Sequence, residues 1–229
     1  DDMTEVWHQN DGHLDATVSI EGSTIYAGTG IEKGSANDRR YAVAYDFQTG
    51  ERKWKKELPM SNWMHPIITK NYVCFTLGEI YFSTLTGLIQ CLDKVDGNPV
   101  FSIPFDGAIA SKGFYIKEES KEYIFFGNMK DEVCGIDLNA REKKWCTKTG
   151  KPNTKSSMSS LDYDPIHGIL WYATFDNGLF AINPKNGNIM LHWSHDDDQW
   201  EDNYASVTID GKYIYQMGIS GTLRKFRID

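Results

Sequence analysis

Short runs of β-branched and aromatic residues recur along the chain, each preceded by a tight turn and an earlier strand-like stretch such as residues 16–20. Five such runs are residues 25–28, 80–83, 124–127, 170–173 and 214–217. Runs of this length and composition, bounded by turn residues, are typical of β-strands. No stretch carries a convincing helical period. The pattern therefore predicts an all-β protein.

A longer phrase also repeats. It reads Ala-Tyr-Asp-Phe-Gln-Thr-Gly-Glu-Arg-Lys-Trp at residues 44–54, and the anchor positions of its four copies (Asp46, Asp93, Asp137 and Asn183) are 47, 44 and 46 residues apart. In the first three copies an aromatic residue follows the anchor by 8 residues. This period is that of a four-stranded propeller blade. The glycine of the phrase supplies the positive φ that a hairpin turn needs.

These observations predict a five-bladed β-propeller with four-stranded antiparallel blades, forming a single domain over residues 1–229. The expected blades cover about residues 13–58, 64–105, 108–148, 157–194 and 203–229. The last blade lacks an outer strand. Residues 1–9 are expected to supply it and close the ring, with Trp7 at the position that Trp54 and Trp145 occupy in their blades. The alternative is that the chain belongs to a longer array of repeats.

The phrase at residues 44–54 resembles the tryptophan-docking repeat of quinoprotein (pyrroloquinoline-quinone-like) β-propellers, with the pattern Ala-x-Asp-x-x-Thr-Gly-x-x-x-Trp. The resemblance implies that the outer-strand Trp packs on the neighbouring blade. Dehydrogenases of this superfamily have larger rings and hold the quinone with an Asp base, a Ca²⁺ site and a tryptophan floor. No cluster of this sequence maps onto that site, so the resemblance implies the fold and not the enzyme. Similar non-catalytic members, such as the scaffold lipoprotein of outer-membrane protein assembly, act as interaction platforms.

Composition narrows the classes of function. The chain has 229 residues, is 40% hydrophobic and 13% aromatic, and carries a formal net charge of −8. This content excludes a disordered chain, and the acidic balance argues against a nucleic-acid partner. No apolar run is long enough for a membrane span. Because the sequence starts at Asp1 and not at Met, we expect an exported (periplasmic or extracellular) protein after signal removal, or else a trimmed chain. We expect a monomer.

Propeller loops gather on one face around the central channel, and this face carries the candidate ligand-binding residues. They are His13, Asp15, Arg39, Trp63, His65, Trp200 and Asp202. Aromatic and polar side chains in a concavity suit a small ligand, a glycan or a protein partner. The favoured function is therefore a non-enzymatic binding propeller. The alternative is a hydrolase or lyase that uses a His–carboxylate pair, His65 with Asp15 or with Asp202.

Five carboxylates lie within residues 196–202. Such a segment binds Ca²⁺ through oxygen ligands, binds a basic partner, or is simply a solvated acidic loop. The spacing of an EF-hand is absent. We therefore expect no cofactor and no metal, with Ca²⁺ at this loop as the alternative.

Two of the four cysteines are placed for pairing. Cys134 and Cys146 flank one hairpin, which predicts a cross-strand disulfide in an exported protein, or else two buried thiols. Cys74 and Cys91 are expected on the first and third strands of the second blade, with residues 80–83 as the strand between them. A bond between this second pair is therefore not expected.

Overall fold

The computed structural model describes residues 3–31, 38–80, 86–150, 158–174, 177–194, 206–218 and 221–228. These residues form 19 strands and no helix. Within them, no helix could cross a membrane. The all-β prediction is confirmed.

The strands form five antiparallel sheets, each built from consecutive strands and called here blades 1 to 5. Blade 1 contains β1 (Ser19–Glu21), β2 (Thr24–Gly28), β3 (Tyr41–Asp46) and β4 (Arg52–Glu57). Blade 2 contains β5 (Ile67–Ile68), β6 (Tyr72–Gly78), β7 (Gly87–Asp93) and β8 (Pro99–Phe105). Blade 3 contains β9 (Phe114–Glu118), β10 (Lys121–Asn128), β11 (Glu132–Asp137) and β12 (Glu142–Lys148). Blade 4 contains β13 (Asp162–Asp164), β14 (Ile169–Ala173), β15 (Leu179–Ile182) and β16 (Ile189–Trp193), and blade 5 contains β17 (Thr208–Asp210), β18 (Tyr213–Met217) and β19 (Leu223–Arg227).

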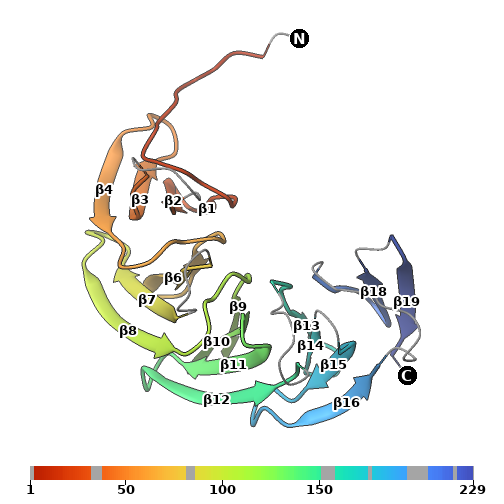
Figure 1. Cartoon of the computed structure of the whole chain (residues 1–229). Coiled ribbons are helices and arrows are strands. Elements are labelled where there is room, and N and C mark those ends of the chain that lie inside the picture. Colours follow the sequence, from red (N-terminus) through yellow and green to blue (C-terminus); the bar gives the residue numbers. More distant parts are fainter. Residues whose placement is uncertain are drawn as a thin grey trace.

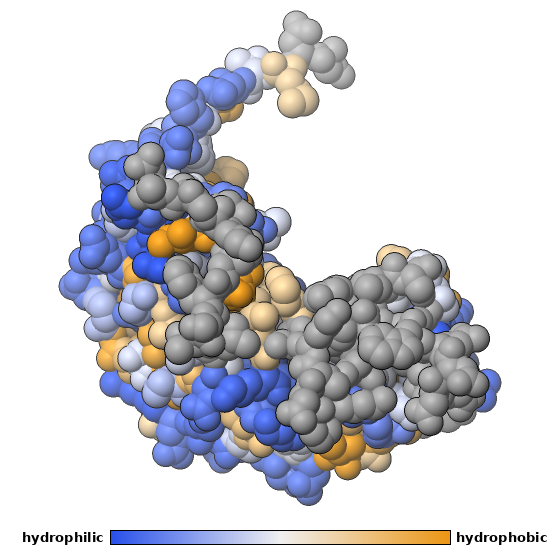
Figure 2. Space-filling view, in the orientation of Figure 1, coloured by the Kyte–Doolittle hydropathy of each residue, from blue (hydrophilic) through white to orange (hydrophobic). Residues whose placement is uncertain are grey.

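The blades stand side by side along an arc, as in a β-propeller (Figure 1). Their first strands lie on the inner side, where β1 contacts β5, β5 contacts β9, and β13 contacts β17. Their last strands lie on the outer side. The space-filling view shows the same curved body, with mostly hydrophilic residues along its outer rim (Figure 2).

The hydrophobic core lies between neighbouring blades. The middle strands are buried on both faces, so strands such as β6 and β10 are nearly continuous apolar runs and do not alternate. Between blades 2 and 3, the rings of Phe105 and Phe126 meet edge to face with centroids 4.8 Å apart. Outer strands such as β12 are mostly exposed. This difference in burial explains why the middle strands were readable from sequence.

Blade 2 differs from the prediction. Its second strand is β6 (Tyr72–Gly78) and not residues 80–83, of which 81–83 lie outside the described residues. Because its first strand is only two residues long, the apolar run of β6 was mistaken for that strand. Cys74 and Cys91 therefore lie directly opposite each other on the adjacent strands β6 and β7, and they form a disulfide. The expectation of no bond was wrong.

For Cys134 and Cys146 the structure decides between the two alternatives left by the sequence, a disulfide or two buried thiols, in favour of the disulfide. Cys134 on β11 faces Cys146 on β12, and the two form a disulfide. All four cysteines of the chain are thus paired. Cys74, Cys91 and Cys134 belong to the same apolar cluster between blades 2 and 3.

The outer tryptophans dock on the next blade, as the resemblance implies. Trp54 of blade 1 donates its indole N–H to the Lys94 carbonyl of blade 2 at 3.1 Å, and its ring covers Gly97. Gly97 has φ +71°, and a Cβ there would lie 2.6 Å from the Trp54 ring. The turn therefore needs glycine both for its backbone conformation and for the space that the indole occupies. Trp145 of blade 3 docks in the same way on blade 4, where it donates to the Pro184 carbonyl at 3.0 Å and covers Gly187.

The junction between blades 2 and 3 replaces both partners of this contact. Phe101 stands where the tryptophan would be, and Arg141, with φ +58°, stands where the glycine would be. The Arg141 guanidinium lies 5.5 Å from the centroid of the Phe101 ring. A cation–ring contact thus takes the place of an indole on glycine.

The N-terminal segment repeats the tryptophan contact on blade 1. Trp7 donates its indole N–H to the Phe47 carbonyl at 3.2 Å, and its ring covers Gly50. Trp7 therefore has the contacts of an outer-strand tryptophan, as predicted from its position. The predicted pairing with the last blade is not seen: residues 3–10 form no strand, and blade 5 has three strands among the described residues. The segment extends away from β19 (Figure 1).

Candidate interaction face

The connector that leads into blade 1 is fixed by one buried carboxylate, Asp11. Its oxygens accept hydrogen bonds from the Arg52 guanidinium at 2.7 and 3.1 Å and from Lys55 Nζ at 2.7 Å. The Tyr45 hydroxyl donates a further hydrogen bond. Burial alone would raise the pKa of Asp11, but these donors outweigh it and the pKa is lowered. Because Arg52 and Lys55 come from β4, the connector is tied to the outer part of blade 1.

The residues after Asp11 include two of the predicted ligand-binding residues, His13 and Asp15, which form a pair that is not predicted from the sequence. His13 Nε2 lies 2.9 Å from Asp15 Oδ1, and these side chains are 32% and 35% exposed. Gly30 donates its backbone N–H to the His13 carbonyl at 3.0 Å. The connector therefore runs beside the loop after β2, and it presents a partly exposed His–carboxylate pair.

Arg39 belongs to the same part of the molecule. Its carbonyl oxygen would lie 3.5 Å from a Cβ on Gly12, and it accepts a hydrogen bond from the Thr29 hydroxyl at 2.7 Å. Arg39 also lines a cleft of about 220 Å³ together with Tyr41 and Glu57. The structure thus brings together three predicted residues, His13, Asp15 and Arg39, which we call the blade 1 loop face.

The connector between blades 1 and 2 adds a polar support. The Glu79 carboxylate accepts hydrogen bonds from Ser61 N and Ser61 Oγ, each at 3.2 Å, and Arg40 Nε lies 2.7 Å from it. Trp63 is only 5% exposed and donates its indole N–H to the Gly78 carbonyl at 2.6 Å. Trp63 therefore lies beneath the loops and supports them. Its ring is too buried in this structure for the predicted role as a surface contact.

His65 faces a different environment. It lines an open pocket of about 330 Å³ on the inner side of the arc, with Ile20 of β1 and Lys112 before β9. Burial, followed by the charge of Lys112, lowers the pKa of His65, which favours a neutral imidazole. Among the described residues no ion pair joins His65 to a carboxylate, and Asp15 is paired with His13. The proposed acid–base pair of His65 and Asp15 is therefore not formed in this structure.

The remaining candidates lie outside the described residues. These are Trp200, Asp202 and the acidic segment 196–202, so the Ca²⁺ alternative stays a prediction. Among the described residues, one group has metal-ligating atoms close together, and it consists of Glu132, Cys134 and Cys146. Both of its sulfurs are in a disulfide, so it offers no thiolate for a metal.

Sequence reasoning missed two of the residues that hold the loops in place, namely Asp11 and Glu79. Asp11 has no local signal, because its partners lie 34 to 44 residues away on β3 and β4. Arg40 and Arg39, at the end of the loop 29–40, are expected from sequence to pair with an anionic group, and Arg40 Nε lies 2.7 Å from the Glu79 carboxylate. The missed residues are structural supports, whereas the predicted His13, Asp15 and Arg39 lie nearer the surface.

Comparisons with known proteins agree with this architecture. The family model described as outer membrane protein assembly factor BamB, a PQQ-like repeat model, matches residues 40–229. BamB from Moraxella catarrhalis has a similar structure, with a TM-score of 0.67 and 17% identity over 93% of this chain and 58% of that protein. A europium-containing methanol dehydrogenase has a TM-score of 0.69 at 13% identity, over 96% of this chain and 50% of that one. A search among curated proteins gives no match.

A third similar structure is the quinohemoprotein alcohol dehydrogenase from Comamonas testosteroni, with a TM-score of 0.68 and 14% identity over 95% of this chain. The chain spans between 42% and 58% of the length of these solved proteins. At such low identity the structural likeness shows the fold alone. The family match, however, covers most of the sequence. It includes β3 and β4 of blade 1 and the whole of blades 2 to 5. The chain therefore belongs to the PQQ-like repeat family whose model is described as outer membrane protein assembly factor BamB.

Proposed function

We propose that this chain is a non-enzymatic interaction module whose blade 1 loop face binds a protein partner. The observation that carries the proposal is the mounting of His13, Asp15 and Arg39 on connectors held by the buried Asp11 and the partly buried Glu79. Polar groups that are already held in place lose little conformational entropy when a partner binds. The exposed side chains offer both signs of charge, which suits recognition of another polar surface.

The family match supports a protein as the partner, because the matching model is described by a role in outer membrane protein assembly. A glycan or a small ligand is a narrower alternative for the same face. The hydrolase or lyase alternative has less support, since Asp15 engages His13 and not His65.

We also propose that the protein works outside the cytoplasm. Its two disulfides favour an oxidising compartment, such as the periplasm or the extracellular space. The description of the matching family, which refers to the outer membrane, points the same way.

Ring closure belongs to the same proposal. The contacts of Trp7 are those of an outer strand belonging to the blade that precedes blade 1. In a ring of five this blade would be blade 5, whose β19 carries Arg224, Lys225 and Arg227, whereas residues 1–9 carry Asp1, Asp2 and Glu5. Opposite charge supports pairing of the two segments.

The experiment is site-specific photo-crosslinking in intact cells, with the photoreactive residue at Arg39 or Asp15. A matched control carries it at Lys56 on the outer strand β4. A protein that crosslinks at both loop positions and not at Lys56, and whose affinity for the purified chain falls about tenfold or more with Arg39→Glu, supports the proposal. Equal crosslinking at all three positions, or an affinity unchanged by Arg39→Glu, would overturn it.

A further inference from the structure

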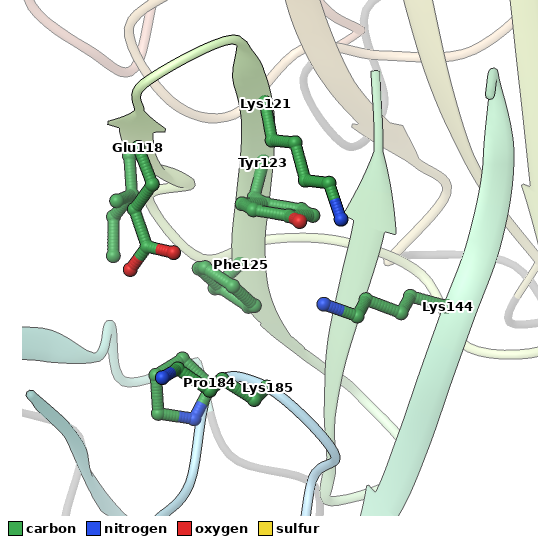
Figure 3. A pocket seen from close by; sticks show the side chains of 8 residues that line it. Glu118, Lys121, Tyr123, Phe125, Lys144, Pro184 and Lys185 are labelled. Carbon is green, nitrogen blue, oxygen red and sulfur yellow. The ribbon is translucent and has the colours of Figure 1, made fainter. Parts of the chain in front are cut away.

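A second cleft lies away from the blade 1 loop face. It is formed between blade 3 and the turn that follows β15 in blade 4. Its volume is about 270 Å³. Its walls come from β9, β10 and β12 on one side and from Pro184 and Lys185 on the other (Figure 3). Nothing in the proposed function uses it.

The floor of this cleft is aromatic and buried. Tyr123 is 6% exposed and Phe125 is 1% exposed, and their ring centroids lie 6.0 Å apart. The ring of Trp145 stacks on Phe125 from the adjacent strand, with centroids 5.7 Å apart. Phe125 is therefore packed between Tyr123 and Trp145, and the small exposed parts of Tyr123 and Phe125 line the cleft. Such a surface suits a flat ring.

The rim of the cleft is cationic. Lys121 and Lys144 extend over Tyr123 toward one another, and Glu118 stands on the opposite side (Figure 3). Lys144 Nζ lies 4.2 Å from the Tyr123 ring centroid. Lys185 completes the lining. In the part of the chain that the structure describes, none of these three lysines forms an ion pair with a carboxylate.

The corresponding site at the junction of blades 1 and 2 differs. Lys53 precedes Trp54 as Lys144 precedes Trp145, but Lys53 lies 3.4 Å from Asp46 Oδ2 and donates to the Thr24 hydroxyl at 2.8 Å. Tyr123 occupies in blade 3 the register position that Thr24 occupies in blade 1, opposite the anchor aspartate. In blade 3 the Tyr123 ring thus replaces the threonine hydroxyl as the neighbour of the lysine, and Lys144 Nζ lies above this ring.

We infer that this cleft binds an aromatic carboxylate. The ligand ring lies against Tyr123 and Phe125, and its carboxylate sits between Lys121 and Lys144, where it relieves the repulsion of neighbouring ammonium groups. Charge-assisted hydrogen bonds to two lysines fix its orientation. Glu118 accepts a hydrogen bond from a hydroxyl or amino group at the opposite end of the ligand. The volume suits one ring with its substituents.

Two sources can present this chemistry: a free small molecule, or an aromatic side chain next to an acidic one in a peptide. The probes are therefore 4-hydroxybenzoate and the blocked peptide acetyl-Glu-Tyr-Glu-amide. Binding is measured by saturation-transfer NMR and titration calorimetry with the full chain. The uncharged 4-hydroxybenzyl alcohol serves as the ligand control.

The variants are Lys121→Gln with Lys144→Gln, and Lys53→Gln as the matched control at the equivalent position of blade 1. These lysines lie at the surface, so all variants are expected to fold, and their circular dichroism spectra are compared first. The double variant is expected to weaken binding of the preferred probe by about tenfold or more, and Lys53→Gln by less than about twofold.

Either probe binding with this dependence on the two lysines supports the inference, and the tighter probe identifies the source. The inference is overturned if neither probe binds, if the alcohol binds as well as the acid, or if the double variant binds like the wild type. None of these results bears on the crosslinking experiment at the blade 1 loop face, so the two proposals fail separately.

Discussion

Two neighbouring junctions of this propeller solve the same packing problem differently. Between blades 1 and 2, Trp54 fills the outer part of the junction by lying on Gly97, and no disulfide lies in that core cluster. Between blades 2 and 3, the smaller Phe101 meets Arg141, and the core cluster contains Cys74, Cys91 and Cys134. The junction without an indole-on-glycine contact is the one whose core contains cysteines of both disulfides, and these bonds brace blades 2 and 3 internally by joining adjacent strands of each blade. The repeat phrase can therefore degenerate where another interaction holds the strands.

The largest effect is expected from the intact tryptophan contact. Trp54→Ala removes a nearly buried indole and its hydrogen bond, and should reduce the free energy of unfolding by about 3–5 kcal/mol. Phe101→Ala should cost less, because Phe101 is only partly buried. Urea unfolding followed by circular dichroism gives both values. A loss for Phe101→Ala as large as that for Trp54→Ala would remove the contrast between the junctions.

The cross-links come next. Replacing Cys134 and Cys146 together by alanine should reduce the free energy of unfolding by about 2–4 kcal/mol. Replacing Cys74 and Cys91 should have a similar effect. The stronger readout is hydrogen exchange, because amides of β7, β10 and β11 should then exchange faster than those of β2 and β3. Faster exchange in blade 1 instead would contradict the bracing role.

Substitutions at the turn residues Gly97 and Arg141 test how the positive φ of each turn contributes to the two junctions. Gly97→Ala forces a Cβ to within 2.6 Å of the Trp54 ring at φ +71°, and should cost about 1–3 kcal/mol. Arg141→Gly relieves a positive φ but removes the cation–ring contact, so its net effect should lie within about 0.5 kcal/mol of zero. Thermal unfolding of both variants is sufficient. Equal losses in the free energy of unfolding for the two variants would show that the two turns contribute equally to stability.

An effect smaller than those of the Trp54 and disulfide variants should come from the N-terminal contact with blade 1, where Trp7 covers Gly50 and Asp11 anchors the connector. Asp11→Asn should cost about 1 kcal/mol near pH 7, since Arg52 and Lys55 keep access to water. The pKa of Asp11 is lowered from 3.8 in the folded state. The carboxylate therefore contributes its full stabilisation above pH 3.8 and loses it as the pH falls further.

Melting temperatures of the wild type and Asp11→Asn between pH 7 and pH 3 check this sign. The difference between them should be constant at neutral pH and shrink in acid. A difference that grew in acid would mean that Asp11 is held in its protonated form.

The sequence predicted the architecture well because the repeat leaves clear marks. Four of the five aromatic runs coincide with second strands, since those strands are buried on both faces. The fifth failed at blade 2, where two apolar runs are adjacent and the first of them, β6, is the second strand of the blade, while residues 81–83 lie outside the described residues. The same error hid the bond between Cys74 and Cys91.

The candidate sites were harder to predict, for a physical reason. His13 was predicted because its place in a connector follows from the repeat, whereas Asp15 was predicted as a partner of His65 and instead pairs with His13. The cleft over Tyr123 combines groups from β9, β10, β12 and the turn after β15, which no local pattern connects. The supports Asp11 and Glu79 were missed because a single carboxylate in a loop does not reveal which cations will surround it.

The pairing of the cysteines has a consequence for their oxidation during the export proposed above. Both bonds join consecutive cysteines, at separations of 17 and 12 residues, and each lies within one blade. Four cysteines allow three pairings, and here the order in which they leave a translocation pore already selects the native one. Each thiol meets its partner before the next pair emerges. An oxidant that acts on the nascent chain therefore suffices, and we expect correct bonds without a disulfide isomerase.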